Sequence, residues 1–162
     1  MDQLTARRRG DLLLHNQTRP SKHMNVLVIE DNEPEQIIMR EAFKEAKVNH
    51  NLFTVKNGIE ALEFLKTEGA FQNVPRPDLI ILDLNMPKKN GIEVLTAIKE
   101  NPKWKHMPVL VFSNSEFSVD ICKCYNLGAN AYLNKPVDFQ GFIDFVHMID
   151  VFWFKLVRYC NH

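Results

Sequence analysis

Five polar side chains with useful chemistry follow short apolar segments that are typical of buried strands. The side chains are Glu30, Asp31, Asp83, Ser113 and Lys135, and the segments are 26–29, 79–82, 109–112 and 131–133. The carboxyl ends of parallel strands lie at one edge of a sheet, where open α/β sheets bind their ligands, so the five side chains would meet there. Taken singly, each has a plainer explanation, such as an Asp that caps the following helix.

Together, the five side chains predict chemistry on a phosphoryl group. Three carboxylates at one edge repel one another, each pair by roughly 4 kcal/mol at 4 Å and an effective dielectric near 20. A cation would offset this repulsion, and hard oxygen ligands with open positions suit Mg²⁺. Lys135 would supply a positive charge for a phosphoryl oxygen, and Ser113 would supply a hydroxyl donor. Asp83, at the end of the most apolar segment, is placed to attack phosphorus.

The elements that would position these side chains alternate regularly along the chain. Strands are predicted at 26–29, 52–55, 79–82, 109–112 and 131–133, each followed by a segment with helical spacing. The last predicted helix is extended and runs from Asp138 to Tyr159. Five strands that alternate with five helices predict an α/β fold, a doubly wound parallel sheet with helices on both faces.

Composition limits the remaining possibilities. The 162 residues suit one domain at 24–162, preceded by a mildly basic segment, 1–23, that is expected to be a disordered extension or a tag. Twenty basic and twenty acidic residues balance, which favours neither a nucleic acid nor a membrane surface as partner. No apolar run approaches the roughly 18 residues of a membrane helix. Three cysteines indicate a reducing compartment, so a cytoplasmic location is expected.

Four segments carry a family resemblance: VLVIEDNEP, DLIILDLNMPKKNG, VLVFSNS and GANAYLNKPV. They closely resemble the motifs of response-regulator receiver domains from two-component signalling, over residues 25 to about 150. The resemblance implies that Asp83 is the phosphoacceptor and that Lys135 binds the phosphate. It also implies that Mg²⁺ is held by Glu30, Asp31, Asp83 and the backbone carbonyl of Asn85, and that Ser113 and Tyr132 are the switch residues.

The resemblance further implies a stand-alone signalling protein rather than an enzyme with an external substrate. A sensor histidine kinase would donate the phosphoryl group, and the receiver would catalyse only its own phosphorylation and slow dephosphorylation. The face formed by the fourth helix, fifth strand and fifth helix would carry the signal. Asn85 and Ser115 flank the path of the attacking water in this family, and they are expected to set the phosphoryl lifetime. Ile37, Ile38 and Pro136 are candidates for kinase contact, although the two isoleucines would equally suit the core.

The final helix predicts an interface. A stripe of apolar residues is expected to face the sheet: Phe142, Phe145, Val146, Ile149, Trp153 and Leu156. Ile143, Val151, Phe154 and Val157 fall outside this stripe, and a monomer seldom exposes so many apolar side chains together. The ending MIDVFWFKLVRY also resembles the extended C-terminus of single-domain regulators paired with phytochrome histidine kinases in cyanobacteria. This similarity implies a homodimer built on the last helix and the last strand. The alternative is a long core helix in a monomer.

Two other functions are compatible with parts of the pattern. Hydrolases that form an aspartyl phosphate also combine Asp, Ser or Thr, Lys and Mg²⁺, but they typically place a second Asp two residues after the nucleophile. Asn85 occupies that position here and cannot act as a general acid. A scaffold that dimerises without phosphorylation is the other alternative, and the complete acidic set with Ser113 and Lys135 argues against it.

Overall fold

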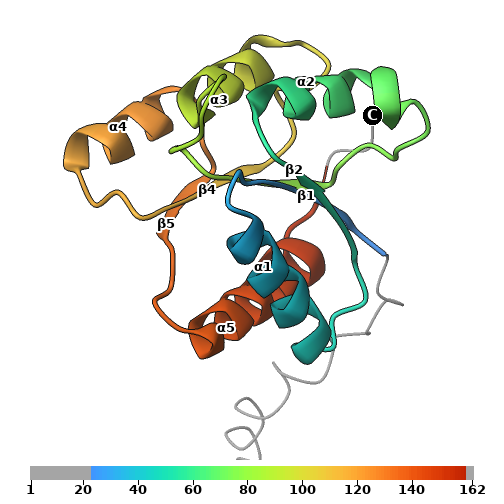
Figure 1. The fold of residues 1–162 in the computed structure, drawn as a ribbon, viewed down its shortest axis with the longest axis vertical. Helices are drawn as coiled ribbons and strands as arrows, with labels where there is room; N and C mark the ends of the chain where they lie inside the picture. Colours follow the sequence, from blue (N-terminus) through green and yellow to red (C-terminus); the bar gives the residue numbers. More distant parts are fainter. Residues whose placement is uncertain (1–22, 160–162) are drawn as a thin grey trace, which may run out of the picture.

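Five short strands form a parallel sheet in the centre of the computed structural model, which describes residues 23–159 (Figure 1). They are β1 (Asn25–Ile29), β2 (Asn51–Val55), β3 (Leu79–Leu82), β4 (Val109–Ser113) and β5 (Ala131–Asn134). Their order across the sheet is β2-β1-β3-β4-β5, and every neighbouring pair is parallel. β3 lies in the middle and is buried at all four positions, as its continuous apolar run predicts.

Helices cover both faces of the sheet (Figure 1). α1 (Glu33–Glu45) and α5 (Phe139–Ile149) lie on one face, and α2 (Gly58–Lys66), α3 (Gly91–Glu100) and α4 (Ser118–Asn126) lie on the other. Two clusters of buried apolar residues fill the spaces between the layers. The doubly wound α/β fold predicted from the sequence is therefore confirmed. No helix within residues 23–159 is long and apolar enough to cross a membrane, and the segment 1–22 lies outside the described residues.

The helices begin and end at residues that satisfy their terminal backbone groups. Four helices have a side-chain N-cap: Asn32, Asn57, Asn90 and Asp138. Beyond α4, Gly128 has a φ of +97°, and its N–H donates to the carbonyl of Tyr125. The N–H of Ala129 donates to the carbonyl of Cys124, which completes a Schellman ending. These ends fix the lengths of the loops that connect helices and strands.

Gly91 lets the start of α3 approach the end of β3. A Cβ at this position would lie 2.3 Å from the carbonyl oxygen of Asp83 and 2.6 Å from the Cα of Leu84. The N–H of Gly91 donates to the carbonyl of Leu84 at 3.1 Å. The backbone that carries Asp83 is therefore packed directly against α3.

The last helical segment differs from its prediction. α5 ends at Ile149, a π-helix (η2, Asp150–Leu156) continues it, and residues 157–159 are not helical. The prediction of one α-helix up to Tyr159 is wrong in this part. A π-helix hydrogen-bonds from i to i+5, so residues after Ile149 advance by a smaller angle and leave the α-helical stripe.

This change of helix type alters which apolar side chains are buried. The first four residues of the predicted stripe are buried: Phe142, Phe145, Val146 and Ile149. Trp153 is half-buried against the same core, but Leu156 is 57% exposed, so its predicted place on the sheet is wrong. Ile143 is 9% exposed and packs in the core, so it lies inside the packed stripe and not outside it.

Candidate functional site

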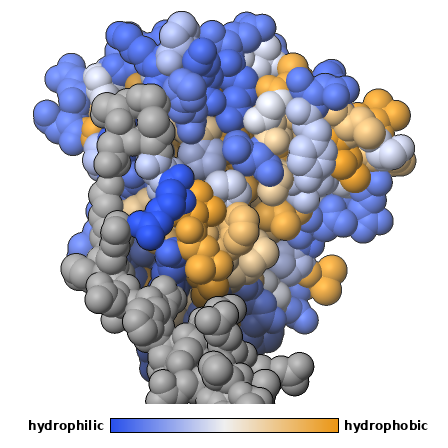
Figure 2. Space-filling view, turned by 180° about the vertical axis from the view of Figure 1, so that it is seen from behind, coloured by the Kyte–Doolittle hydropathy of each residue, from blue (hydrophilic) through white to orange (hydrophobic). Residues whose placement is uncertain are grey.

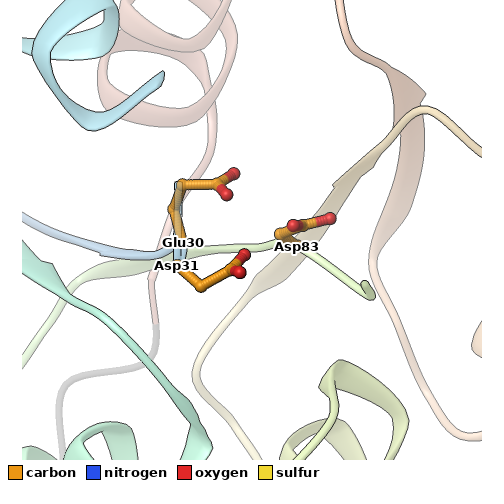
Figure 3. A group of neighbouring side chains, drawn as sticks. All are labelled: Glu30, Asp31 and Asp83. Atoms are coloured by element: carbon orange, nitrogen blue, oxygen red, sulfur yellow. The ribbon is translucent and has the colours of Figure 1, made fainter. Parts of the chain in front are cut away.

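Three carboxylates meet at the carboxyl ends of β1 and β3. Glu30, Asp31 and Asp83 each offer an oxygen that lies within 4.8 Å of the others (Figure 3). The β1–β3 pairing continues past the strands, because the N–H of Asp83 donates to the carbonyl of Ile29 at 3.0 Å. Glu30 and Asp83 are both 5% exposed, whereas Asp31 is only partly buried. The predicted meeting of these three side chains is therefore observed.

The crowding of negative charge affects Glu30 most. Burial raises the pKa of Glu30 to about 7; the charge of Asp83 adds to this effect, while the hydrogen bond from Lys135 opposes it. The Oε1 of Glu30 also accepts a hydrogen bond from the N–H of Asn32 at 3.0 Å. Burial therefore outweighs the hydrogen bonds from Lys135 and Asn32, which stabilise the ionised form of Glu30.

Lys135 supplies the positive charge of the site. The backbone N–H of Lys135 donates to the backbone carbonyl of Ser113 at 3.0 Å, and this bond joins the ends of β4 and β5. Its Nζ lies 2.7 Å from Oε2 of Glu30 and 3.5 Å from Oδ2 of Asp83. The lysine side chain is 5% exposed, so these charges interact with little screening by water.

Two residues of α1 contact the site and were not predicted from the sequence. The Oε2 of Glu35 lies 2.5 Å from Nζ of Lys135, and the Nε2 of buried Gln36 donates to the carbonyl of Glu30 at 2.5 Å. Glu35 stands five residues after Glu30, in the first turn of the helix that directly follows β1. This spacing was the available signal, and an acidic residue in the first turn of a helix has a simpler explanation through the helix dipole.

The loop after β4 links Ser113 to α4 and β5. Ser113 is fully buried, and its Oγ accepts a hydrogen bond from the N–H of Ser115 at 3.2 Å. The Oγ of Ser115 donates to Oδ2 of Asp120 in α4 at 2.6 Å, and the hydroxyl of Tyr132 donates to the carbonyl of Ser115 at 2.7 Å. The two predicted switch residues are therefore connected through Ser115.

The other predicted site residues lie around this centre. Asn85 is exposed, and its N–H donates to Oδ1 of Asp83 at 3.3 Å. Ile37 is 49% exposed on α1, whereas Ile38 is half-buried against the core. Pro136 is half-buried and packs against α5, because a Cβ on Gly141 would lie 2.5 Å from the Cβ of Pro136. Of the two isoleucines, Ile37 is thus the more accessible to a partner.

The predicted dimer residues are exposed to different extents. Val151 is 49% exposed, and Val157 is partly buried. Phe154 packs edge-on against the ring of His50, with 4.3 Å between the ring centroids. Other apolar side chains of this segment are 41% to 57% exposed: Met148, Phe152 and Leu156. Hydrophobic side chains also gather on the surface in the view from behind (Figure 2).

The donor set of the site fits a hard divalent cation. Three carboxylates lie together, two of them buried, and Lys135 is the lysine that contacts them in the described part of the chain. Oxygen ligands and surplus negative charge are what Mg²⁺ or Mn²⁺ requires. Glu30, Asp31 and Asp83 are accordingly the residues that would hold such an ion.

Comparison with known proteins gives consistent matches. The response regulator receiver domain family matches residues 26–147. Response regulator Rcp1 of Synechocystis sp. is 38% identical over 132 residues, which are 82% of this chain and 90% of Rcp1. The structure of the phosphorylated cyanobacterial phytochrome response regulator RcpA is similar, with a TM-score of 0.80 and 38% identity over 86% of this chain and all of RcpA. The Mn²⁺-bound form of Rcp1 has a TM-score of 0.77 and 36% identity over 85% of this chain and 99% of that structure.

Proposed function

The chain belongs to the response regulator receiver family, and we propose that it is a stand-alone regulator that accepts a phosphoryl group on Asp83 from a sensor histidine kinase. The observation that carries this proposal is the position of Lys135, whose ammonium lies between Glu30 and Asp83 at the edge of the sheet. An ammonium beside an aspartate can neutralise the charge that a phosphoryl group brings to that aspartate.

In the proposed transfer, a carboxylate oxygen of Asp83 attacks phosphorus. An oxygen–phosphorus bond forms, and the bond between phosphorus and the kinase histidine breaks, leaving its electron pair on the histidine nitrogen. Lys135 orients and neutralises the phosphoryl oxygens, and the buried Ser113 offers a hydroxyl donor. Mg²⁺ held by Glu30, Asp31, Asp83 and the backbone carbonyl of Asn85 would supply further positive charge. The same residues account for slow dephosphorylation, so no external substrate is required.

We extend the proposal to a phytochrome as the kinase partner. It is supported by the similarity to a cyanobacterial phytochrome response regulator over 86% of this chain. Among the candidates for kinase contact, Ile37 on α1 is exposed, whereas Ile38 and Pro136 are half-buried. A cytoplasmic location, which suits the free thiols of Cys122 and Cys124, is part of the same proposal.

We propose that the signal leaves through α4, β5 and α5 and that the protein forms a homodimer through its last helical segment. Tyr132 contacts the loop that carries Ser115. Movement of Ser113 toward a phosphoryl group would therefore change the hydrogen bonds of Ser115 and Tyr132 on this face. The dimer is supported by the exposed apolar side chains of Val151, Phe152 and Leu156, which a second copy would cover.

The test is the intact mass of the protein after incubation with acetyl phosphate, with and without Mg²⁺, beside the variant Asp83→Asn. We expect one added phosphoryl group on the wild type with Mg²⁺, and none on the variant or without the metal. If no adduct forms while the fold is intact, binding of beryllofluoride distinguishes two explanations. Binding would indicate an acyl phosphate that decays too quickly to detect, and lack of binding would favour a scaffold without phosphoryl chemistry.

A further inference from the structure

The two hydrogen bonds of the Lys135 ammonium go to glutamates and not to the proposed acceptor Asp83. An ammonium has three N–H donors. Oxygens of three carboxylates lie around Nζ, from Glu30 at 2.7 Å, Glu35 at 2.5 Å and Asp83 at 3.5 Å. The two short contacts are to the glutamates and the long one is to the proposed acceptor. The glutamates therefore hold the ammonium closer to themselves than to Asp83, and they compete with a phosphoryl oxygen on Asp83 for the charge of Lys135.

The two glutamates differ in how easily they can leave. The side chain of Glu30 is 6% exposed, and its other oxygen accepts a hydrogen bond from the N–H of Asn32. The side chain of Glu35 is 26% exposed and stands in the first turn of α1, at the surface. A carboxylate that turns into water regains its hydration, whereas one that is released inside the protein remains unpaired. Glu35 is thus the partner that can exchange.

We propose that Glu35 is a positioning residue that holds Lys135 in the unphosphorylated protein and competes with the phosphoryl group for its ammonium. This inference rests on the proposed function, because it needs Asp83 as the acceptor. Glu35 would reduce the affinity of the site for a phosphoryl group and would turn toward water when the group is present. It lies on α1 two residues before the half-exposed Ile37, so a partner that docks on α1 reaches the same helical turn.

The test measures the affinity of beryllofluoride, a phosphoryl mimic, by ¹⁹F NMR or calorimetry at saturating Mg²⁺. We expect Glu35→Gln to bind beryllofluoride about threefold to tenfold more tightly than the wild type, the range for one partly exposed charged contact. An unchanged or weaker affinity in Glu35→Gln would overturn the inference.

Two matched variants separate the contact from a general effect of charge. Glu33→Gln removes an exposed carboxylate from the same first turn of α1, and its affinity should stay within about twofold of the wild type. Glu35→Asp keeps the charge but shortens the side chain, so it should resemble Glu35→Gln. If Glu35→Asp instead resembles the wild type, or if Glu33→Gln gains as much as Glu35→Gln, the effect comes from charge and not from the contact with Lys135.

Failure of this inference and failure of the proposed function give different results. Binding of beryllofluoride to the wild type and not to Asp83→Asn supports the proposed function whatever Glu35→Gln does. Absence of binding to the wild type would overturn both proposals. Urea unfolding of each variant shows that the compared proteins are folded alike.

Discussion

The Nε2 of His50 donates to Oδ1 of Asp150 at 3.0 Å, although the two residues are 100 positions apart. This bond joins the loop before β2 to the residue at which α5 gives way to the π-helix η2. The His50 side chain is 3% exposed, and its Nδ1 accepts from the N–H of Met24 at 3.4 Å. The two hydrogen bonds of His50 therefore link the start of η2 to the residue before β1, at the amino-terminal edge of the sheet.

We expect Asp150→Asn to lower the free energy of unfolding by about 1–3 kcal/mol, because it weakens a buried, charge-assisted hydrogen bond. Burial alone would raise the pKa of Asp150, but hydrogen bonds from Lys155 and His50 outweigh it and hold that pKa below its ordinary value. The stabilisation should be complete above the ordinary carboxyl pKa of about 4 and lost as the pH falls further. Urea unfolding between pH 7 and pH 3 measures this difference.

The control for Asp150→Asn is Lys155→Ala, because the lysine side chain is 56% exposed and bonds the other oxygen of Asp150. Its loss should cost less than about 1 kcal/mol. Equal losses in Lys155→Ala and Asp150→Asn would contradict a special role for His50.

Mg²⁺ or Mn²⁺ should stabilise the wild type. Free metal at ten times its Kd contributes about 1.4 kcal/mol, which corresponds to a rise in Tm of about 3–6 °C for a protein of this size. Asp31→Asn should abolish the rise, yet without metal it should be at least as stable as the wild type because like-charge repulsion is relieved. Glu33→Gln should keep the rise. Thermal unfolding with metal and with EDTA measures these effects, and a full rise in Asp31→Asn would contradict the proposed site.

Gly91→Ala should damage the site through the backbone of Asp83, because its Cβ would lie 2.3 Å from the carbonyl of that residue. We expect a loss of about 1–3 kcal/mol in the free energy of unfolding and a smaller rise of Tm with metal. Gly69→Ala is the control: its φ is +57° and nothing lies within 4 Å, so it costs backbone strain alone and should keep the rise with metal. An undiminished rise in Gly91→Ala would contradict this account.

Ser115→Glu should change the hydrolysis rate of the acyl phosphate. The Oγ of Ser115 lies 2.6 Å from a carboxylate oxygen of Asp120, so a glutamate there would be repelled from α4 and would displace the loop that follows Ser113. We expect a change of about tenfold or more, since positioning of an attacking water affects rates on this scale. The rate is read from the decay of the phosphorylated mass, and Ser115→Ala shows the effect of losing the hydroxyl alone. An unchanged rate in Ser115→Glu would argue against a role for Ser115 in phosphoryl lifetime.

Val151→Glu should yield a monomer if the last helical segment forms the proposed homodimer. Val151 is 49% exposed, so a charge there leaves the protomer folded but opposes burial against a second copy. Light scattering at tens of micromolar measures the change. Val137→Glu, at a fully exposed position before α5, is the control and should remain dimeric. A wild type that is already monomeric would overturn the dimer.

The sequence by itself determined the architecture and most of the site. Local signals set the strands and helix ends, because apolar runs, N-caps and Gly128 act over a few residues. The alternation of strands and helices also implies that Glu30, Asp31 and Asp83 meet, since parallel strands end at one edge of a sheet whatever the details of packing.

Only the tertiary structure decided which side chains from different elements contact one another. That Lys135 contacts Glu35, that His50 holds Asp150, and that Ser115 bonds Asp120 depends on how helices pack against the sheet. The π-helix after Ile149 and the burial of Ile143 have the same origin. Periodicity assigns a residue to a face, but the packing of whole layers fixes the distances over which charges and hydrogen bonds act.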